Sequence, residues 1–234
     1  MSLLGPAAML LCFDIEGAAI AEHDHWHSHE HLPERLAIPG FLRGTRWAAV
    51  DGAPRYMVLY EVSALDTLTS DAYLQRLNNP TPWTQQMMKH YRGMSRGLCS
   101  VVWSEGVGVG GHALLLRFGR GPGHEAAVDG WLDMHVRGSL AGQPGMASAH
   151  LLRGAAAARM TNEQQIRGAD AGVDHALVLT AYDAGALAEV QRSLAGAKGL
   201  APHGATDVHC ALYRLQHSVL RASSPGPHWP MRVG

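Results

Sequence analysis

The feature that most constrains the fold of this chain is an internal repeat. Each half carries a tryptophan, then a histidine, then a proline-glycine pair. The residues are Trp26, His31 and Pro39-Gly40 in the first half, and Trp131, His135 and Pro144-Gly145 in the second half. The tryptophans and the proline-glycine pairs are each 105 residues apart, whereas the histidines are 104 residues apart. A period of this length indicates a duplicated structural unit.

The expected elements follow the same order in both halves: strand, helix, strand, strand, helix, strand. In the first half we expect strands at 8–15, 41–50, 55–62 and 97–104, and helices at 20–32, 67–77 and 81–91. In the second half we expect strands at 112–118, 146–153, 174–182 and 205–215, and helices at 124–137 and 184–197. Pro33 is expected to end the first helix, because proline has no N–H for the helical ladder. Residues 154–172 have no counterpart in the first half.

A βαββαβ unit is the ferredoxin-like arrangement, an antiparallel sheet with two helices on one face. If nothing covered the other face, its apolar side chains would be exposed to water, at a free-energy cost of about 25 cal/mol for each Å² of apolar surface. Two units can cover each other, so the sequence predicts an α+β fold with two antiparallel sheets packed face to face as a barrel. We expect the first unit at 1–106, the second at 107–217 and a Pro/Gly-rich tail at 218–234.

The composition argues against several classes of function. The 234 residues carry 19 Lys and Arg against 20 Asp and Glu, so no basic surface is available for nucleic acid. No apolar run reaches the roughly 18 residues of a membrane span, and the first residues lack the basic region of a signal peptide. The three cysteines are far apart and form no ligand pattern. We therefore expect a cytoplasmic protein without nucleic acid or membrane partners; homodimer formation is left open.

Two segments carry a family resemblance. Residues 26–41 read W-x4-H-L-P-E-R-L-A-I-P-G-F, and RYMVLYEVSALDTL follows at 55–68. These motifs resemble the EthD-like branch of the dimeric α+β barrel superfamily, in which a helix ends in a histidine and the chain turns through Pro-Gly into the second strand. The resemblance covers about the first 100 residues well and the second half only through its repeated residues. It implies a cleft between sheet and helices, and relatives that include small monooxygenases, lactone isomerases and haem enzymes.

The stretch HDHWHSHEH at 23–31 contains five of the 15 histidines and raises the question of a metal site. His27 to His31 matches H-x-x-E-H, the pattern of inverted zinc peptidases. A zinc site needs a third protein ligand, and no residue elsewhere in the chain is an evident partner. We expect no metal and no cofactor, and a metal-binding function is the least favoured hypothesis.

Helical spacing places His23, His27 and His31 on one stripe and His25 and His29 on another. We expect His23, His25 and His29 to face solvent, because a helix packed on a sheet has one wet face. His31 stands at the expected helix end, where the resemblance places a histidine that faces the cleft. It could exchange a proton near pH 7 or, alternatively, cap the helix C-terminus.

Other side chains complete the candidate site. Glu34 and Arg35 could form an ion pair in the turn, orient His31, or bind a carboxylate through the guanidinium. Tyr56 and Tyr60 share one face of their strand, either as core residues or as part of the cleft. We expect His31 and Tyr60 to be catalytic. The expected substrate-binding residues are Trp26, His27, Glu34, Arg35, Trp47, Tyr56, Trp83 and His135, with Trp26 and Trp47 as walls of the cleft.

Two hypotheses for the function remain after these exclusions. The first is a protein that binds a small, mostly apolar organic ligand and acts on it without a cofactor, by proton transfer or oxygenation. The second is a non-enzymatic binding or assembly module of the same fold, whose exposed sheet edges pair between chains. A cavity beside His31 would favour the first hypothesis, and a cleft filled by side chains would favour the second.

Overall fold

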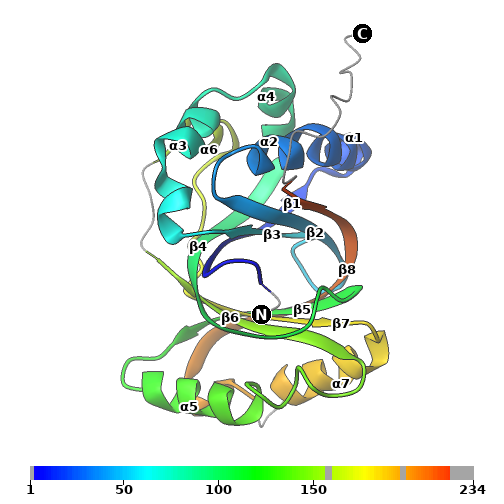
Figure 1. Cartoon of the computed structure of the whole chain (residues 1–234), viewed down its shortest axis with the longest axis vertical. Coiled ribbons are helices and arrows are strands. Elements are labelled where there is room, and N and C mark those ends of the chain that lie inside the picture. Colours follow the sequence, from blue (N-terminus) through cyan, green and yellow to red (C-terminus); the bar gives the residue numbers. More distant parts are fainter. Residues whose placement is uncertain (1–2, 156–159, 196–198, 222–234) are drawn as a thin grey trace.

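The computed structural model describes residues 3–155, 160–195 and 199–221, and these form a closed antiparallel barrel of eight strands (Figure 1). The first-half strands are β1 (Ala7–Ile15), β2 (Phe41–Asp51), β3 (Tyr56–Val62) and β4 (Tyr91–Gly106). The second-half strands are β5 (His112–Arg120), β6 (Met146–Gly154), β7 (His175–Ala181) and β8 (Ala205–Leu220). The first-half helices are α1 (Ile20–Trp26), α2 (Leu32–Leu36), α3 (Asp71–Asn78) and α4 (Pro82–Met88). The second-half helices are α5 (Glu125–His135), α6 (Asn162–Arg167) and α7 (Ala184–Ala195).

Strand pairing shows two ferredoxin-like units that share one barrel. The order around the barrel is β1-β3-β2-β8-β5-β7-β6-β4, and β4 pairs back with β1. Within each half the order is fourth, first, third and second strand, as in a βαββαβ unit. The units join where β2 pairs with β8 and where β4 pairs with β6. The predicted α+β fold, a tandem pair of such units in one barrel, is confirmed.

Three apolar clusters hold the barrel and its helices together. One fills the barrel interior, with side chains such as Leu10, Met57, Leu115 and Tyr213. A second lies between the first-half sheet and α1 to α4, and a third lies between the second-half sheet and α5 and α7 (Figure 1). Because side chains alternate along a strand, the same eight strands supply the interior and both outer layers.

The first helical segment runs through Pro33 to Leu36, so the prediction that Pro33 ends it is wrong. The segment accommodates the proline through a π-helical turn at His27–His31, which joins α1 to α2. Proline cannot donate to the carbonyl four residues earlier, and its ring collides with that carbonyl in a regular α-helix. A wider turn relieves this collision, and such π turns are frequent at functional sites.

The same turn explains why the histidines of the repeat are 104 rather than 105 residues apart. A π turn contains one more residue than an α turn. His31 therefore follows Trp26 by five residues, whereas His135 follows Trp131 by four residues in the regular helix α5. In both halves the two rings still meet, with centroids 4.5 Å apart in the first half and 4.9 Å apart in the second. The duplication is thus visible in side-chain geometry as well as in strand order.

Three further elements differ from the sequence-based expectations. β4 begins at Tyr91, a residue that the helical spacing of its neighbours placed in a helix. β8 continues to Leu220, so the expected start of the tail at residue 218 lies inside a strand, and residues 222–234 lie outside the described residues. Helix α6 was not expected; it falls in the stretch 154–172 that has no counterpart in the first half.

Gly44 on β2 sets the distance between the sheet and α2. A Cβ atom at this position would lie 2.5 Å from Leu32 Cδ2 and 3.0 Å from Tyr60 Cε1. We expect Gly44→Ala to lower the free energy of unfolding by about 1–3 kcal/mol, because the added methyl group pushes the helix and the tyrosine away. The control is Gly130→Ala in α5, where no atom lies within 4 Å of an added Cβ and a gain of about 0.5–1 kcal/mol is expected. Urea denaturation measures both, and an unchanged Gly44→Ala variant would contradict this close packing.

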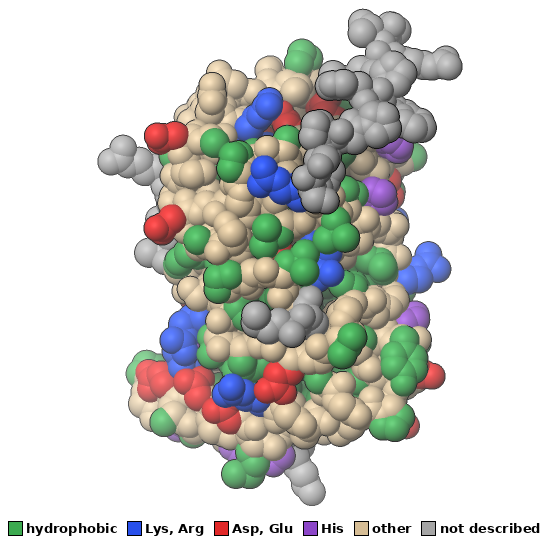
Figure 2. Space-filling view, in the orientation of Figure 1, with side chains coloured by type: hydrophobic (Ala, Val, Ile, Leu, Met, Phe, Trp, Pro, Cys, Tyr) green, Lys and Arg blue, Asp and Glu red, His purple; other side chains and the backbone are tan. Residues whose placement is uncertain are grey.

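Apolar side chains on the surface are scattered rather than gathered. Figure 2 shows them spread among polar side chains across one face of the molecule. The large exposed apolar residues in the described ranges are Leu4, Val50, Val102, Val107, Met134, Met160, Tyr182 and Leu220. Single apolar residues of this kind are normal on protein surfaces. None of the helices in the described ranges has the length and apolar character that crossing a membrane requires.

Candidate functional site

A small cavity lies between the outer face of the first-half sheet and the helices that cover it. Its volume is about 20 Å³, which is room for about one water molecule. The apolar side chains that line it are Met9, Leu11, Leu77, Met88 and Met94. The polar side chains that line it are His27, His31, Arg35, Tyr60, Tyr73, Tyr91, Arg96, Thr161, Glu163 and Arg167. The polar lining is therefore unusually rich in ionisable groups for so small a space.

His27 and His31 enter the cavity from the π turn. They are 1% and 5% exposed, and their ring centroids are 5.4 Å apart. Burial lowers the pKa of both imidazoles well below 6.5; the charge of His31 adds to this effect at His27, and the charge of Arg35 adds to it at His31. Both rings are therefore neutral near pH 7, and each has one N–H donor and one acceptor nitrogen.

Four polar atoms of the cavity residues have no hydrogen-bond partner among the described residues. They are Nδ1 of His27, Nδ1 of His31, Nη1 of Arg35 and the hydroxyl of Tyr60. Each buried atom left in this state costs about 1–3 kcal/mol. Such atoms are rare in native proteins, and their presence calls for an explanation such as a water, a ligand or a functional role. Their grouping around one cavity is the strongest sign of a binding site in the described chain.

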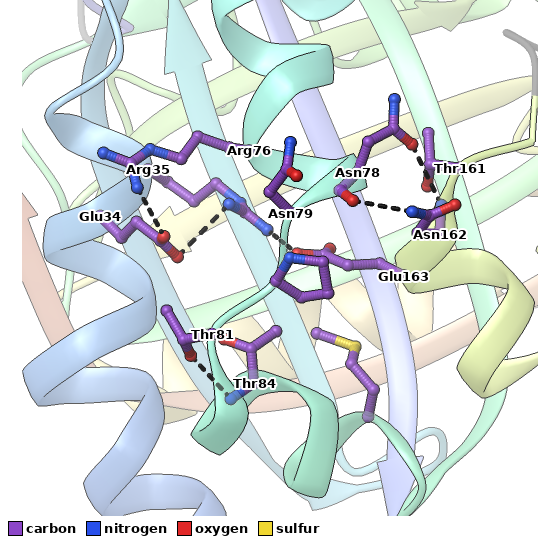
Figure 3. A network of polar contacts seen from close by, with 12 residues as sticks. Glu34, Arg35, Arg76, Asn78, Asn79, Thr81, Thr84, Thr161, Asn162 and Glu163 are labelled. Carbon is purple, nitrogen blue, oxygen red and sulfur yellow. Dashed lines mark hydrogen bonds and ion pairs between the residues drawn. The ribbon is translucent and has the colours of Figure 1, made fainter.

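Arg35 is the charged centre of the cavity. Its side chain is 2% exposed and extends from α2 to Glu163 on α6, with which it forms a buried ion pair (Figure 3). Glu34 forms a weaker ion pair with Arg35. Its carboxylate is 3.6 Å from Arg35 Nη1 and is shared with the half-exposed Arg76, whose Nη1 is 3.2 Å away. Burial disfavours the charged form of Arg35, but the charges of Glu163, Tyr73, Tyr60 and Glu34 together outweigh it and raise the pKa of the guanidinium. Arg35 is thus a permanent buried cation.

Helix α6 reaches this site from the second half of the chain. The connection between β6 and β7 crosses the edge of the barrel to lie beside α3 and α4 (Figure 1). The two buried side chains of α6 are polar, Glu163 and Gln164. Asn162 donates to Asn78 from its backbone N–H at 3.2 Å and from its side-chain amide at 2.7 Å. Ala171, after the helix, pairs with β4. Polar contacts therefore dominate the attachment of α6.

A hydrogen-bonded chain connects the cavity with the surface of α1. Nε2 of His23 lies 3.2 Å from the hydroxyl of Tyr91, and Nδ1 of His23 lies 3.3 Å from a carboxylate oxygen of Asp24. Burial lowers the pKa of His23, so its ring is neutral near pH 7. His23 is fully buried, which corrects the expectation that it faces solvent, whereas His25 and His29 are exposed as expected. His23 thus links the hydroxyl of Tyr91, a lining residue, to the partly exposed carboxylate of Asp24.

Several of the predicted site residues lie together. Those that line the cavity are His27, His31, Arg35 and Tyr60. Trp26 lies one layer behind them, against the ring of His31. Tyr56 donates its hydroxyl to Asp24 at 2.7 Å and lies outside the lining. Trp83 donates its indole N–H to Glu22 at 3.3 Å and also lies outside the lining.

Trp47 does not line the cavity, and the prediction that it forms a wall with Trp26 is wrong. It is 2% exposed in the barrel interior, on the opposite face of the sheet. If side chains alternated regularly along β2, Trp47 would lie on the same face of the sheet as Phe41. Phe41 packs in the apolar cluster between this sheet and the helices. The register of β2 against β3 shifts between Phe41 and Arg43. An extra residue in a strand moves all later side chains to the other face, which explains the position of Trp47.

His135 lies on the other side of the barrel, in a cleft between α5 and α7. This cleft has a volume of about 480 Å³ and is lined by Trp131, Leu140, Val190 and Leu194 among others. Nδ1 of His135 lies 3.0 Å from the carbonyl oxygen of Trp131. The lining includes no arginine or tyrosine among the described residues, in contrast to the first-half cavity. The structure therefore separates His135 from the other predicted site residues.

Sequence reasoning missed part of the lining. The spacing of Tyr91 from Trp83 and Met87 indicates an apolar helix face, yet its hydroxyl reaches His23 from β4. Glu163 and Arg167 belong to the stretch without a counterpart in the first half. Their spacing of four residues is the one signal that could have marked them, because such pairs meet on a helix. Arg167 lies 3.8 Å from Glu163 and 2.8 Å from Asp170.

The described residues include no group of three or more His, Cys, Asp and Glu side chains that could hold a metal ion. Glu30, the carboxylate of the H-x-x-E-H pattern, has a different set of contacts. It accepts hydrogen bonds from the indole of Trp26 at 3.0 Å and from the hydroxyls of Thr81 and Thr84 at 2.6 and 3.2 Å. Glu30 therefore ties α1 to α4.

No protein-family model matches the chain, and no curated protein matches it. An anthrone oxidase-like protein has a TM-score of 0.62 and 12% identity over 95% of this chain and 96% of its own. A candidate monooxygenase from Fusobacterium nucleatum subsp. nucleatum has a TM-score of 0.59 and 8% identity over 94% and 97%. A heme-binding protein from Thermus thermophilus has a TM-score of 0.53 and 10% identity over 92% of both chains. The fold is a dimeric α+β barrel. At these identities a shared dimeric α+β barrel establishes the fold alone, and the EthD-like branch remains a prediction.

Haem, which one of these dimeric α+β barrel proteins binds, does not fit the cavity beside His31. The walls carry buried charges, Arg35 and Glu163, where a porphyrin plane would need apolar surface.

Proposed function

We propose that this protein binds a small organic molecule in the cavity beside His31 and acts on it without a cofactor, as an EthD-like enzyme of proton transfer or oxygenation. The observation that carries the proposal is the group of buried polar atoms on His27, His31, Arg35 and Tyr60 that have no hydrogen-bond partner among the described residues, although Arg35 Nη1 lies 3.6 Å from the Glu34 carboxylate. A ligand with one or two oxygen atoms would give these atoms hydrogen bonds, and their relief would favour binding. The three free cysteines support a reducing compartment, and we place the protein in the cytoplasm.

His31 is the proton-transfer group in this proposal. Burial, together with the charge of Arg35, keeps its imidazole neutral, so it can accept a proton from a C–H bond next to a carbonyl group. The hydroxyl of Tyr60 and the guanidinium of Arg35 would then bind the oxygen on which negative charge develops. Burial raises the pKa of Tyr60, so the hydroxyl keeps its proton and remains a donor.

A substrate anion formed in this way could also react with dioxygen. In that case a CH2 group becomes a carbonyl group: one oxygen atom of O2 enters the product, and the other leaves as water with the two hydrogen atoms. The substrate supplies the electrons, so this reaction needs neither flavin nor metal. Proton transfer is the common first step of both reaction types.

A thermal-shift screen with mixtures of small metabolites tests this proposal. We expect at least one compound to raise the melting temperature of the wild-type protein, because only a ligand of the native state does so. The same compound should have no effect on His31→Gln or Tyr60→Phe, and its full effect on the control His25→Gln, which changes an exposed histidine. In D2O, the wild-type protein should exchange a C–H of the compound about 100-fold faster than His31→Gln. Equal melting shifts in all four proteins would contradict the proposal.

A non-enzymatic binding or assembly module is the second candidate function. The cavity volume of about 20 Å³ favours it, because side chains fill most of the space beside His31. Under this alternative a compound that binds is recovered unchanged, with no C–H exchange and no oxygen uptake. The D2O experiment therefore separates the two functions.

A further inference from the structure

We propose that the ligand of the cavity beside His31 is an organic carboxylate. In the free protein the side-chain carboxylate of Glu163 on α6 occupies the position that the carboxylate of the ligand would take. The inference rests on the proposed function, because it assumes that this cavity is a ligand site. It adds the chemical class of the ligand and the residue that competes with it.

The charges around the cavity favour an anion. The guanidinium groups that line it are Arg35, Arg96 and Arg167. Asp170, outside the lining, neutralises Arg167 through both carboxylate oxygens at 2.8 and 2.9 Å. Glu163 is the carboxylate in the lining and forms the buried ion pair with Arg35. Without Glu163, the cavity would carry excess positive charge, since its histidines are neutral.

The guanidinium of Arg35 has more hydrogen-bond donors than its contact with Glu163 uses. Nη2 donates to Glu163, whereas Nη1 has no hydrogen-bond partner among the described residues. A planar carboxylate can accept from two guanidinium nitrogens at once, which is the strongest geometry for such pairs. The hydroxyl of Tyr60 is a further unpartnered donor at the same cavity. A free carboxylate could therefore form more hydrogen bonds here than the tethered side chain of Glu163 does.

The attachment of α6 permits exchange for a ligand. Its buried side chains are polar, and Ile166 is the one residue of the helix that packs, partly buried, against the apolar cluster of the first half. The helix itself contributes one partly buried apolar side chain, so its own apolar cost of moving is small, and the apolar body of a ligand would cover the lining that it leaves. The main loss is the ion pair between Glu163 and Arg35, and a bound carboxylate would replace it. Figure 3 shows that Glu163 approaches Arg35 from the side of α6.

The rest of the ligand should be apolar. Leu11 and Leu77 line the cavity together with three methionines, Met9, Met88 and Met94. Methionine side chains are flexible and adapt to the shape of a bound group. We therefore expect a carboxylate attached to a compact apolar body, such as an aromatic ring.

Benzoate and benzamide provide a matched pair of probes, because they share a shape but differ in charge. The full-length wild-type protein is compared by calorimetric titration with Glu163→Ala, which opens the position, and with Glu125→Gln, which changes an exposed carboxylate on α5. We expect benzoate to bind Glu163→Ala about tenfold or more tighter than the wild-type protein or Glu125→Gln. Benzamide should bind all three weakly, and benzoate should shift the NMR signals of the His31 ring.

Equal benzoate affinity in the three proteins would overturn the inference. Glu163→Gln provides a second variant of nearly native shape, and benzoate should raise its melting temperature more than that of Glu125→Gln; an equal shift would also overturn it. Binding of benzamide beside His31 without binding of benzoate would reject the carboxylate and leave the proposed function standing. If neither probe binds any variant, the carboxylate is rejected, and the metabolite screen alone decides the proposed function.

Discussion

Acidification from about pH 7.5 to about pH 5.5 is expected to lower the free energy of unfolding by about 4 kcal/mol. The main cause is three histidines buried in the neutral form, His27, His31 and His150; His23, whose pKa burial also lowers, acts in the same direction. Burial lowers the pKa of His150 to about 3 and that of His27 and His31 well below 6.5. Between these values and 6.5 the unfolded chain binds protons that the folded chain does not bind. The contribution of these histidines to the free energy of unfolding is therefore fully present above pH 6.5. Below pH 6.5 it decreases by about 1.4 kcal/mol per pH unit for each histidine.

Urea denaturation at the two pH values measures this loss. In His31→Phe one of the three groups is absent, so the difference between the two pH values should shrink by about 1.4 kcal/mol. His25→Gln changes an exposed histidine of α1 and should keep the full difference. A urea midpoint that is the same at both pH values would show that these histidines are not buried in the neutral form.

Removal of the Glu163 charge is expected to lower the free energy of unfolding by about 3–5 kcal/mol. In Glu163→Gln the buried guanidinium of Arg35 loses its close partner, and among the described residues it keeps the ion pair with Glu34, which is 3.6 Å away and shared with Arg76. The comparison is Arg76→Gln, which removes a half-exposed ion pair and should cost less than about 1 kcal/mol. Burial of the charge, rather than the number of ion pairs, sets the size of the effect.

The double variant Arg35→Met, Glu163→Leu makes this test specific. It removes both charges, so no unpaired ion is buried, and most of the stability lost in Glu163→Gln should return. Urea denaturation of the single and double variants gives the coupling between the two positions. If Glu163→Gln were as stable as the wild-type protein, the ion pair would not hold α6 on the first half.

The fold could be predicted because its determinants are local and repeated. The Pro-Gly pairs lie directly before β2 and β6, and Gly40 and Gly145 have φ angles of +92° and +90°. Glycine adopts this left-handed conformation without strain, so the same turn recurs in both halves. Alternation along β3 correctly placed Tyr56 and Tyr60 on one face. Such patterns are visible within a few residues and need no knowledge of distant contacts.

Single-residue irregularities account for two of the errors, those at Pro33 and Trp47. The π turn before Pro33 adds one residue to a helix, and the register shift after Phe41 adds one residue to β2. Each changes which later side chains face the cavity, and this is why Trp47 was misplaced. The one-residue difference in the spacing of the repeated histidines reflects the π turn, whereas the register shift in β2 has no evident sequence signal, because the packing of strand on strand determines where it is tolerated.

The site could be predicted only where one helix or strand supplies it. His27 and His31 share a helical stripe, and Tyr60 follows from strand alternation. The pair of Arg35 and Glu163 joins positions 128 residues apart, from different halves of the chain. No local pattern predicts such a contact. The placement of α6 also makes the two halves unequal, because the second half contributes Glu163 and Arg167 to the lining of the cavity in the first half.

An NMR titration of the His31 imidazole, alone and with a compound from the metabolite screen, tests the central claim most directly. We expect a midpoint below 6.5 for the free protein, because burial and the charge of Arg35 lower the pKa of His31, and a change of the ring signals when the compound binds. A midpoint at 6.5, as for a solvated imidazole, with ring signals that no compound changes, would contradict a ligand site beside His31.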